Sequence, residues 1–247
     1  MSTTTASIPR PTSLRHPLAL TLLSLTFTTG VVDAVSYLGL GHVFTANMTG
    51  NVVLLGFGLA GAGHLPVLAP IVSLAAFLVG AAIAGRIAAQ LKSADGPPLI
   101  LALVLEAALV AAAAVLASAL KIAPGSAAGY VTIALIALAM GIRNATIRKI
   151  ALPDLTTTVL TMTLTGLAAE SPLGGGNGQG TVRRLAASGA LLIGALVGGL
   201  LTKVSLTAAL AVAAGSVAIS AAAYEAAHER SAAAYAGRAA HGRGVAV

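Results

Sequence analysis

Long apolar runs separated by short polar stretches fill most of the chain. Six runs contain few or no charged residues, and they cover 17–40, 67–91, 98–121, 126–142, 186–202 and 204–223. A helix needs about 20 consecutive apolar residues to cross a bilayer. Each run therefore predicts a transmembrane helix, with 186–202 near the lower limit of length. The pattern indicates an all-α integral membrane fold.

Composition and charge agree with this reading. Hydrophobic residues make up 57% of the chain, charged residues 9%, and the mean hydropathy is +0.94, whereas soluble domains carry about 25% charged residues. The net charge of +7 does not indicate nucleic-acid binding, because the basic residues flank apolar runs, where they set topology. The absence of cysteine excludes disulfides, thiolate metal sites and cysteine nucleophiles.

The two ends of the chain are more polar than its centre. Residues 1–16 are rich in Ser, Thr and Pro and are expected to form a disordered cytoplasmic N-terminus. A signal peptide is excluded because the next apolar run exceeds the usual core of about 7–15 residues. Residues 17–223 are predicted to form one transmembrane domain, followed by a cytoplasmic C-terminal tail at 224–247.

Two further segments, 45–62 and 155–170, are only partly apolar. If both crossed the membrane, there would be eight spans, and the basic residues would divide almost evenly between the two sides. With six spans and the N-terminus inside, only Lys121 and Lys203 lie outside, as the positive-inside rule favours. We therefore predict six full transmembrane helices plus two partial or re-entrant segments, whose polar groups must be covered by protein or line a water-filled cavity.

Similar residues recur in the same order in the two halves of the domain, about 17–121 and 126–223. The alignment pairs Gly30 with Gly141, Asp33 with Asn144, Thr49 with Thr161, Gly80 with Gly194 and Gly85 with Gly199. Three spans per half would make this a 3+3 inverted repeat, in which solutes bind where broken segments meet near the midplane. Those segments would be 45–62 and 155–170. The small residues at 80–85 and 194–199 also predict close helix packing.

Two motifs carry a family resemblance. "GVVDAVSYLGLGHVFTANMTGNVVLLG" (30–56) and "TTTVLTMTLTGLAAE" (156–170) resemble the YoaK-like family of uncharacterised bacterial membrane proteins, which is grouped as a domain of unknown function. The resemblance spans about 17–223. It implies a multi-pass protein of the bacterial inner (cytoplasmic) membrane, and it brings no substrate or activity.

Asp33 is the first candidate site residue, since a carboxylate within a spanning helix is a functional hypothesis by default. Thr26, Thr29, Asp33 and Tyr37 follow at three- and four-residue steps, so they share a helix face that is expected to look into the bundle. Asp33 could couple protons or bind a solute. It could equally be structural, paired with Arg143 or capping the partial segment.

Polar side chains in the two partial segments are further candidates. Asn47, Thr49, Gly50 and Asn51 could line a solute path or could satisfy only the backbone of a broken helix. Thr158, Thr161 and Thr165 lie on one helical face. Most threonines of that segment are expected to bond their own preceding carbonyls.

Three other polar residues lie in or beside apolar runs. Asn144 is a stronger candidate site residue because it is the repeat counterpart of Asp33. Arg143 is expected to extend to the cytoplasmic face with Arg148 and Lys149. Glu106 stands alone in its apolar run, where it would be a buried acid or face another protomer.

The sequence favours a transporter or channel for a small solute, in which Asp33 couples or coordinates and Asn47 to Asn51 line the path. The alternative is a non-transporting assembly or sensory partner, with the polar motif as a structural plug. An enzyme is not expected, because no nucleophile–base–acid set and no paired metal-ligand spacing is present. The expected partners are the lipid bilayer and a small molecule or ion, without nucleic acid or cofactor. Homo-oligomerisation is left open.

Overall fold

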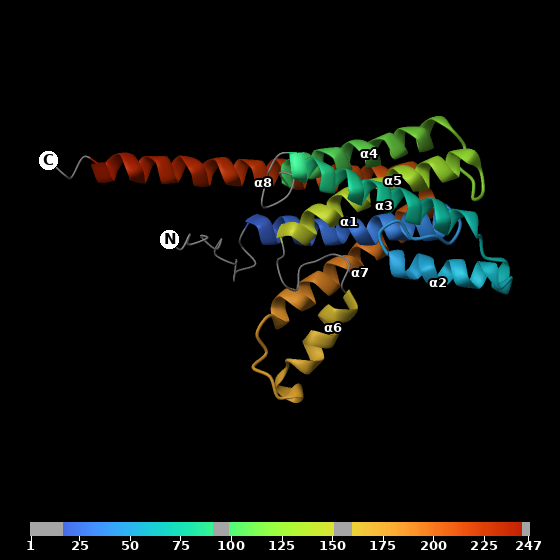
Figure 1. Cartoon of the computed structure of the whole chain (residues 1–247), viewed down its shortest axis with the longest axis horizontal. Helices are drawn as coiled ribbons and strands as arrows, with labels where there is room; N and C mark the ends of the chain where they lie inside the picture. Colours follow the sequence, from blue (N-terminus) through green and yellow to red (C-terminus); the bar gives the residue numbers. More distant parts are fainter. Residues whose placement is uncertain (1–16, 91–98, 151–159, 244–247) are drawn as a thin grey trace.

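The computed structural model describes residues 17–90, 99–150 and 160–243, and every regular element within these ranges is helical (Figure 1). Two short 3-10 turns lie at Ala62–His64 and Pro172–Gly174. The helices are α1 Pro17–Gly39, α2 Met48–Leu59, α3 Leu68–Gln90, α4 Leu99–Ala119, α5 Ala127–Ile150, α6 Leu160–Ala169, α7 Thr181–Val204 and α8 Leu206–Arg243. The region predicted as a disordered N-terminus, 1–16, lies outside the described residues.

Six of these helices, α1, α3, α4, α5, α7 and α8, are long and apolar enough to cross a membrane. The other two, α2 and α6, are only 12 and 10 residues long. The prediction of six spans and two partial segments is therefore confirmed at the level of helix length and composition.

Several helices extend beyond their apolar runs. Helix α5 continues through the basic residues that follow 142, and α7 begins before Arg183. Helix α8 runs on to Arg243, so most of the predicted tail continues the last helix, which projects well beyond the bundle in Figure 1. Charged side chains near the end of a helix do not break it, because they can reach water.

Glycines bring the long helices together in two crossed pairs, α1 with α7 and α3 with α5. A Cβ atom at Gly30 would overlap the Leu191 carbonyl, and one at Gly194 would overlap the Phe27 carbonyl. The other pair is alike, with Gly80 against Leu138 and Gly141 against Phe77. Such backbone contact at small residues is how membrane helices associate without a hydrophobic driving force. The predicted packing role is confirmed for Gly80 and Gly194, whereas Gly85 faces open space.

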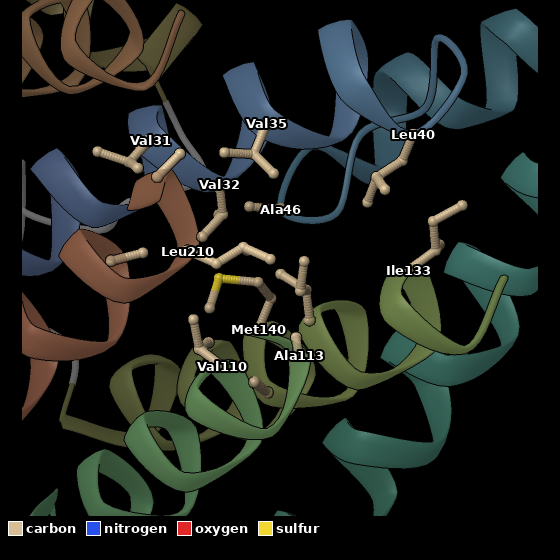
Figure 2. Packing of buried hydrophobic residues seen from close by; sticks show 14 of the residues in the cluster. Val31, Val32, Val35, Leu40, Ala46, Val110, Ala113, Ile133, Met140 and Leu210 are labelled. Atoms are coloured by element: carbon tan, nitrogen blue, oxygen red, sulfur yellow. The ribbon is translucent and has the colours of Figure 1, made fainter. Parts of the chain in front are cut away.

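Helices α4 and α8 pack together and join the two crossed pairs, α4 resting on α5 and α8 on α1. The main core cluster lies where these four helices converge. Figure 2 shows its centre, where Val32 of α1, Val110 of α4, Met140 of α5 and Leu210 of α8 come together, all fully buried.

The two short helices do not meet. Helix α2 packs against α3, and α6 packs against α7. In Figure 1, α2 lies at the end of the bundle where α1 finishes, whereas α6 lies beside the first turns of α7. The expectation that 45–62 and 155–170 meet near the midplane is wrong for the described residues. Each short helix packs instead against the next long helix of its own half, to which residues 60–67 and 170–180 connect it.

Candidate functional site

Asp33 binds the backbone of the loop that follows its own helix. Its Oδ1 atom accepts hydrogen bonds from the backbone N–H groups of Thr45, at 3.1 Å, and Ala46, at 2.9 Å. The carboxylate is half-buried, and it satisfies donors that lipid could not. The geometry therefore gives Asp33 the capping role that was one of its two sequence interpretations.

Asn51 fastens the same loop to α2 and α3. Its amide nitrogen donates to the carbonyl of Phe44 at 2.6 Å, and its amide oxygen accepts from the N–H of Phe44 at 2.9 Å. Ser73 of α3 donates to the same carbonyl at 2.7 Å and accepts from Asn51 at 3.1 Å. Asn51 and Ser73 are both fully buried. Asn51 therefore pairs with both backbone groups of Phe44 as a neighbouring strand would.

The rest of the motif forms the start of α2. Asn47 is the N-cap, and its side chain accepts a hydrogen bond from the N–H of Gly50 at 3.1 Å. Gly50 lies against the ring of Phe44, where a Cβ atom would be crowded. Tyr37 stacks on the same ring, with the ring centroids 5.0 Å apart. Asn47 and Thr49 are exposed, whereas Asn51 is buried.

A fully buried ion pair in the described bundle joins Arg143 of α5 to Glu106 of α4. Arg143 Nη1 lies 2.9 Å from Glu106 Oε1, and neither side chain is exposed. The guanidinium also donates to the carbonyl of Leu25 at 3.1 Å and to the hydroxyl of Thr29 at 2.6 Å, both on α1. One side chain thus links three helices.

One sequence expectation is corrected by this contact. Arg143 does not extend to the cytoplasmic face, whereas Glu106 is a buried acid, as expected, and is paired with Arg143. The reason is that α5 continues to Ile150, which places Arg143 within the helix, more than a turn before its basic end at Arg148. Its side chain then faces α4 and α1 instead of water.

The ion pair leaves two polar atoms unsatisfied. Glu106 Oε2 and Arg143 Nε are buried and have no hydrogen-bond partner among the described residues. Leaving a buried polar atom unpaired costs about 1–3 kcal/mol, and more for a charged group, so such atoms call for an explanation such as a bound water or ion. Asp33 lies one turn beyond Thr29 on the same face of α1. We call Asp33, Glu106, Arg143 and Thr29 the polar cluster.

The candidates in the second half of the chain lie apart from this cluster or make local contacts. The Asn144 side chain donates to the carbonyl of Met140 at 2.8 Å. Thr161 and Thr165 are exposed on α6, and the Thr165 hydroxyl donates to the Thr161 carbonyl at 2.8 Å, as expected of threonine in such a helix. Thr158 lies outside the described residues.

The sequence interpretation missed two anchoring residues. One is Ser73, and the other is Arg184, which is buried and donates to the carbonyl of Gly166 at 2.9 Å and to Glu170 at 2.6 Å. Arg184 thereby fastens α6 to α7, although it was counted only as a topology signal. The sequence signal that could have identified Ser73 was its position as a lone polar residue within an apolar run.

These features define a multi-pass α-helical membrane protein with an ion pair buried between its helices. The chain belongs to the family described as a protein of unknown function (DUF1275), which matches residues 21–223. It is 37% identical over 152 residues to the UPF0700 transmembrane protein YoaK of Bacillus subtilis (strain 168), a match covering 61% of this chain and 66% of that protein. The resemblance drawn from the two motifs is confirmed. No solved structure matches the chain.

The contacts of Asn51 predict the effect of removing its side chain. Asn51→Ala leaves the N–H of Phe44 without a partner and its carbonyl with Ser73 as the remaining donor, so we expect the free energy of unfolding in detergent to fall by about 1–3 kcal/mol. Thr49→Ala, two residues away and exposed, is the control and should change it by less than about 0.5 kcal/mol. Equal effects of the two substitutions would contradict the anchoring role of Asn51.

Proposed function

We propose that this protein is a transporter or channel for a small solute and that the polar cluster handles the charge of that solute or of a coupled ion. The observation that carries the proposal is the fully buried Glu106–Arg143 pair. Ionisable residues inside a membrane bundle are costly and characteristically mark ion and substrate pathways. A buried pair is also a poor source of stability, because apolar side chains of similar volume often serve as well.

We also propose a 3+3 inverted repeat, because corresponding helices of the two halves make corresponding contacts. The contacts of α1 with α7, α4 with α5, and α2 with α3 correspond to those of α5 with α3, α8 with α1, and α6 with α7. The backbone contacts made by Gly30 and Gly194 likewise correspond to those made by Gly141 and Gly80. Many transporters are built from inverted repeats, in which one set of helices rocks against the other around a fixed site.

In this proposal the remaining candidates border the route to the cluster. Asn47 and Thr49 are exposed at the start of α2, and Thr161 and Thr165 are exposed on α6. Because the two short helices lie apart in Figure 1, they would serve two different entrances. Asn51 itself supports the loop and does not contact the solute in this proposal.

We further propose that the protein lies in the bacterial inner membrane with both termini in the cytoplasm. This orientation follows from the basic residues that flank the spans. Because the chain has no cysteine, His64→Cys and Asn177→Cys test it directly. A membrane-impermeant thiol reagent should label residue 64, but not residue 177, in intact cells. The reverse pattern, or labelling of both residues, would contradict this orientation.

A second candidate is a non-transporting assembly or sensory partner. The long α8 favours it, because this helix continues to Arg243, beyond the span that ends at Arg230. In that case the projecting end of α8 would bind another protein, and the loop at 44–51 would serve only as a structural plug.

Flux measurements separate the two candidates. In proteoliposomes, a panel of small neutral, anionic and cationic solutes is screened by the current or tracer uptake that each produces. For a transported solute, Arg143→Lys and Asp33→Asn should lower the rate at least about tenfold, because each disrupts charge-assisted hydrogen bonds worth about 1.5–3 kcal/mol. Ser118→Ala, near the end of α4 and exposed, should leave the rate unchanged. Flux unaffected by both cluster substitutions would rule out the proposed site.

A further inference from the structure

The charged groups inside the described bundle are not balanced. Asp33, Glu106 and Arg143 are the charged residues that lie away from the helix ends within the described spans. The others lie near helix ends or in the last turns of the α8 span, and they are Arg86, Arg148, Lys149, Arg183, Arg184, Lys203, Glu225, Glu229 and Arg230. The interior of the described spans therefore holds two carboxyl groups and one guanidinium, and full ionisation would leave one excess negative charge. An uncompensated charge of this kind is strongly destabilising.

The two carboxyl groups are held differently. Asp33 accepts two backbone N–H groups at one oxygen, an arrangement that suits a carboxylate. Glu106 accepts from Arg143 only at Oε1, and its Oε2 atom is buried without a partner in the described part of the chain. A carboxylic acid whose proton is on Oε2 would still accept the arginine hydrogen bond at Oε1.

The helices packed around Glu106 supply no other ionisable group to change this balance. Helix α4 packs on α5 and α8. From α5 the facing charge is Arg143, and residues 206–223 of α8 contain no ionisable side chain. Helix α1 contributes Asp33 and, one turn further, Tyr37, whose ring meets His42.

We propose that Glu106 binds one exchangeable proton at Oε2, and that this proton is the coupling ion. This inference rests on the proposed transport function. With the proton bound, the charge of Arg143 is balanced by Asp33. Release of the proton to the aqueous phase turns Glu106 into a carboxylate, which then becomes the counter-charge of Arg143. The carboxylate that balances the charge of Arg143 thus changes from Asp33 to Glu106, and this change biases the contact between α4, α5 and α1.

A proton fits the site better than a metal cation. It needs a single lone pair, whereas a bound metal ion needs several oxygen ligands. Within the described residues, no group of three His, Asp or Glu side chains could hold a metal ion. One guanidinium, one carboxylate and one carboxylic acid together carry no net charge. Binding a single proton is therefore enough to neutralise the three groups.

Infrared difference spectroscopy of the full chain in nanodiscs tests the protonation state directly. At neutral pH the wild-type protein should show the C=O band of a buried carboxylic acid, which shifts in deuterium oxide. Glu106→Gln should abolish the band, and Asp33→Asn should retain it. The proposal is overturned if the wild type lacks the band or if Glu106→Gln keeps it.

Thermal unfolding supplies a second readout, because glutamine imitates the neutral acid. The unfolding midpoint of Glu106→Gln should stay near that of the wild type, whereas Arg143→Gln should lower it clearly. Equal losses would mean that Glu106 is ionised, which overturns the proposal. A midpoint that NaCl raises relative to choline chloride in the wild type, but not in Glu106→Gln, would assign the site to sodium and also overturn it. Neither measurement requires transport. If the carboxylic acid band is present but no solute flux is found, the proposed function is contradicted and the protonation of Glu106 is not.

Discussion

Lipid offers no hydrogen bonds, and this constraint governs where every polar group of the chain lies. The loop between α1 and α2 shows how it is met. Asp33 and Asn51 supply the partners that the backbone of residues 44–46 would otherwise lack, and Ser73 joins them from α3. The loop can therefore turn at the end of the bundle although apolar helices surround it. The buried side chains of this conspicuous polar motif thus make the hydrogen bonds that water would otherwise make to the loop backbone.

The same constraint makes the polar cluster unusual. The hydrogen-bonding needs of the pair are met only partly, because one nitrogen atom of Arg143 and one oxygen atom of Glu106 have no hydrogen-bond partner in the described bundle. The close backbone contacts between the crossed helices lie elsewhere, at Gly30, Gly194, Gly80 and Gly141. The backbone packing of the crossed pairs therefore does not depend on the ion pair.

Much of the fold could be predicted from the sequence, because the length of an apolar run and the placement of basic residues report directly on the bilayer. The six spans, the two short helices and the packing role of Gly80 and Gly194 followed from these patterns. The site was harder to predict. The pairing of Glu106 with Arg143 depends on which helices pack together, and residues 37 positions apart carry no local signal of contact. The end of α5 was also placed too early, which put Arg143 at the membrane surface.

The central claim is that the buried pair serves function and not assembly. Its most direct test is the free energy of unfolding, together with solute flux, of the variant Arg143→Met, Glu106→Leu, Asp33→Asn, which removes all three charged groups together. The account predicts a protein at least as stable as the wild type, because apolar replacement of a buried ion pair is often neutral or stabilising by about 1–4 kcal/mol, but without flux. A stable variant that transports at the wild-type rate would contradict it.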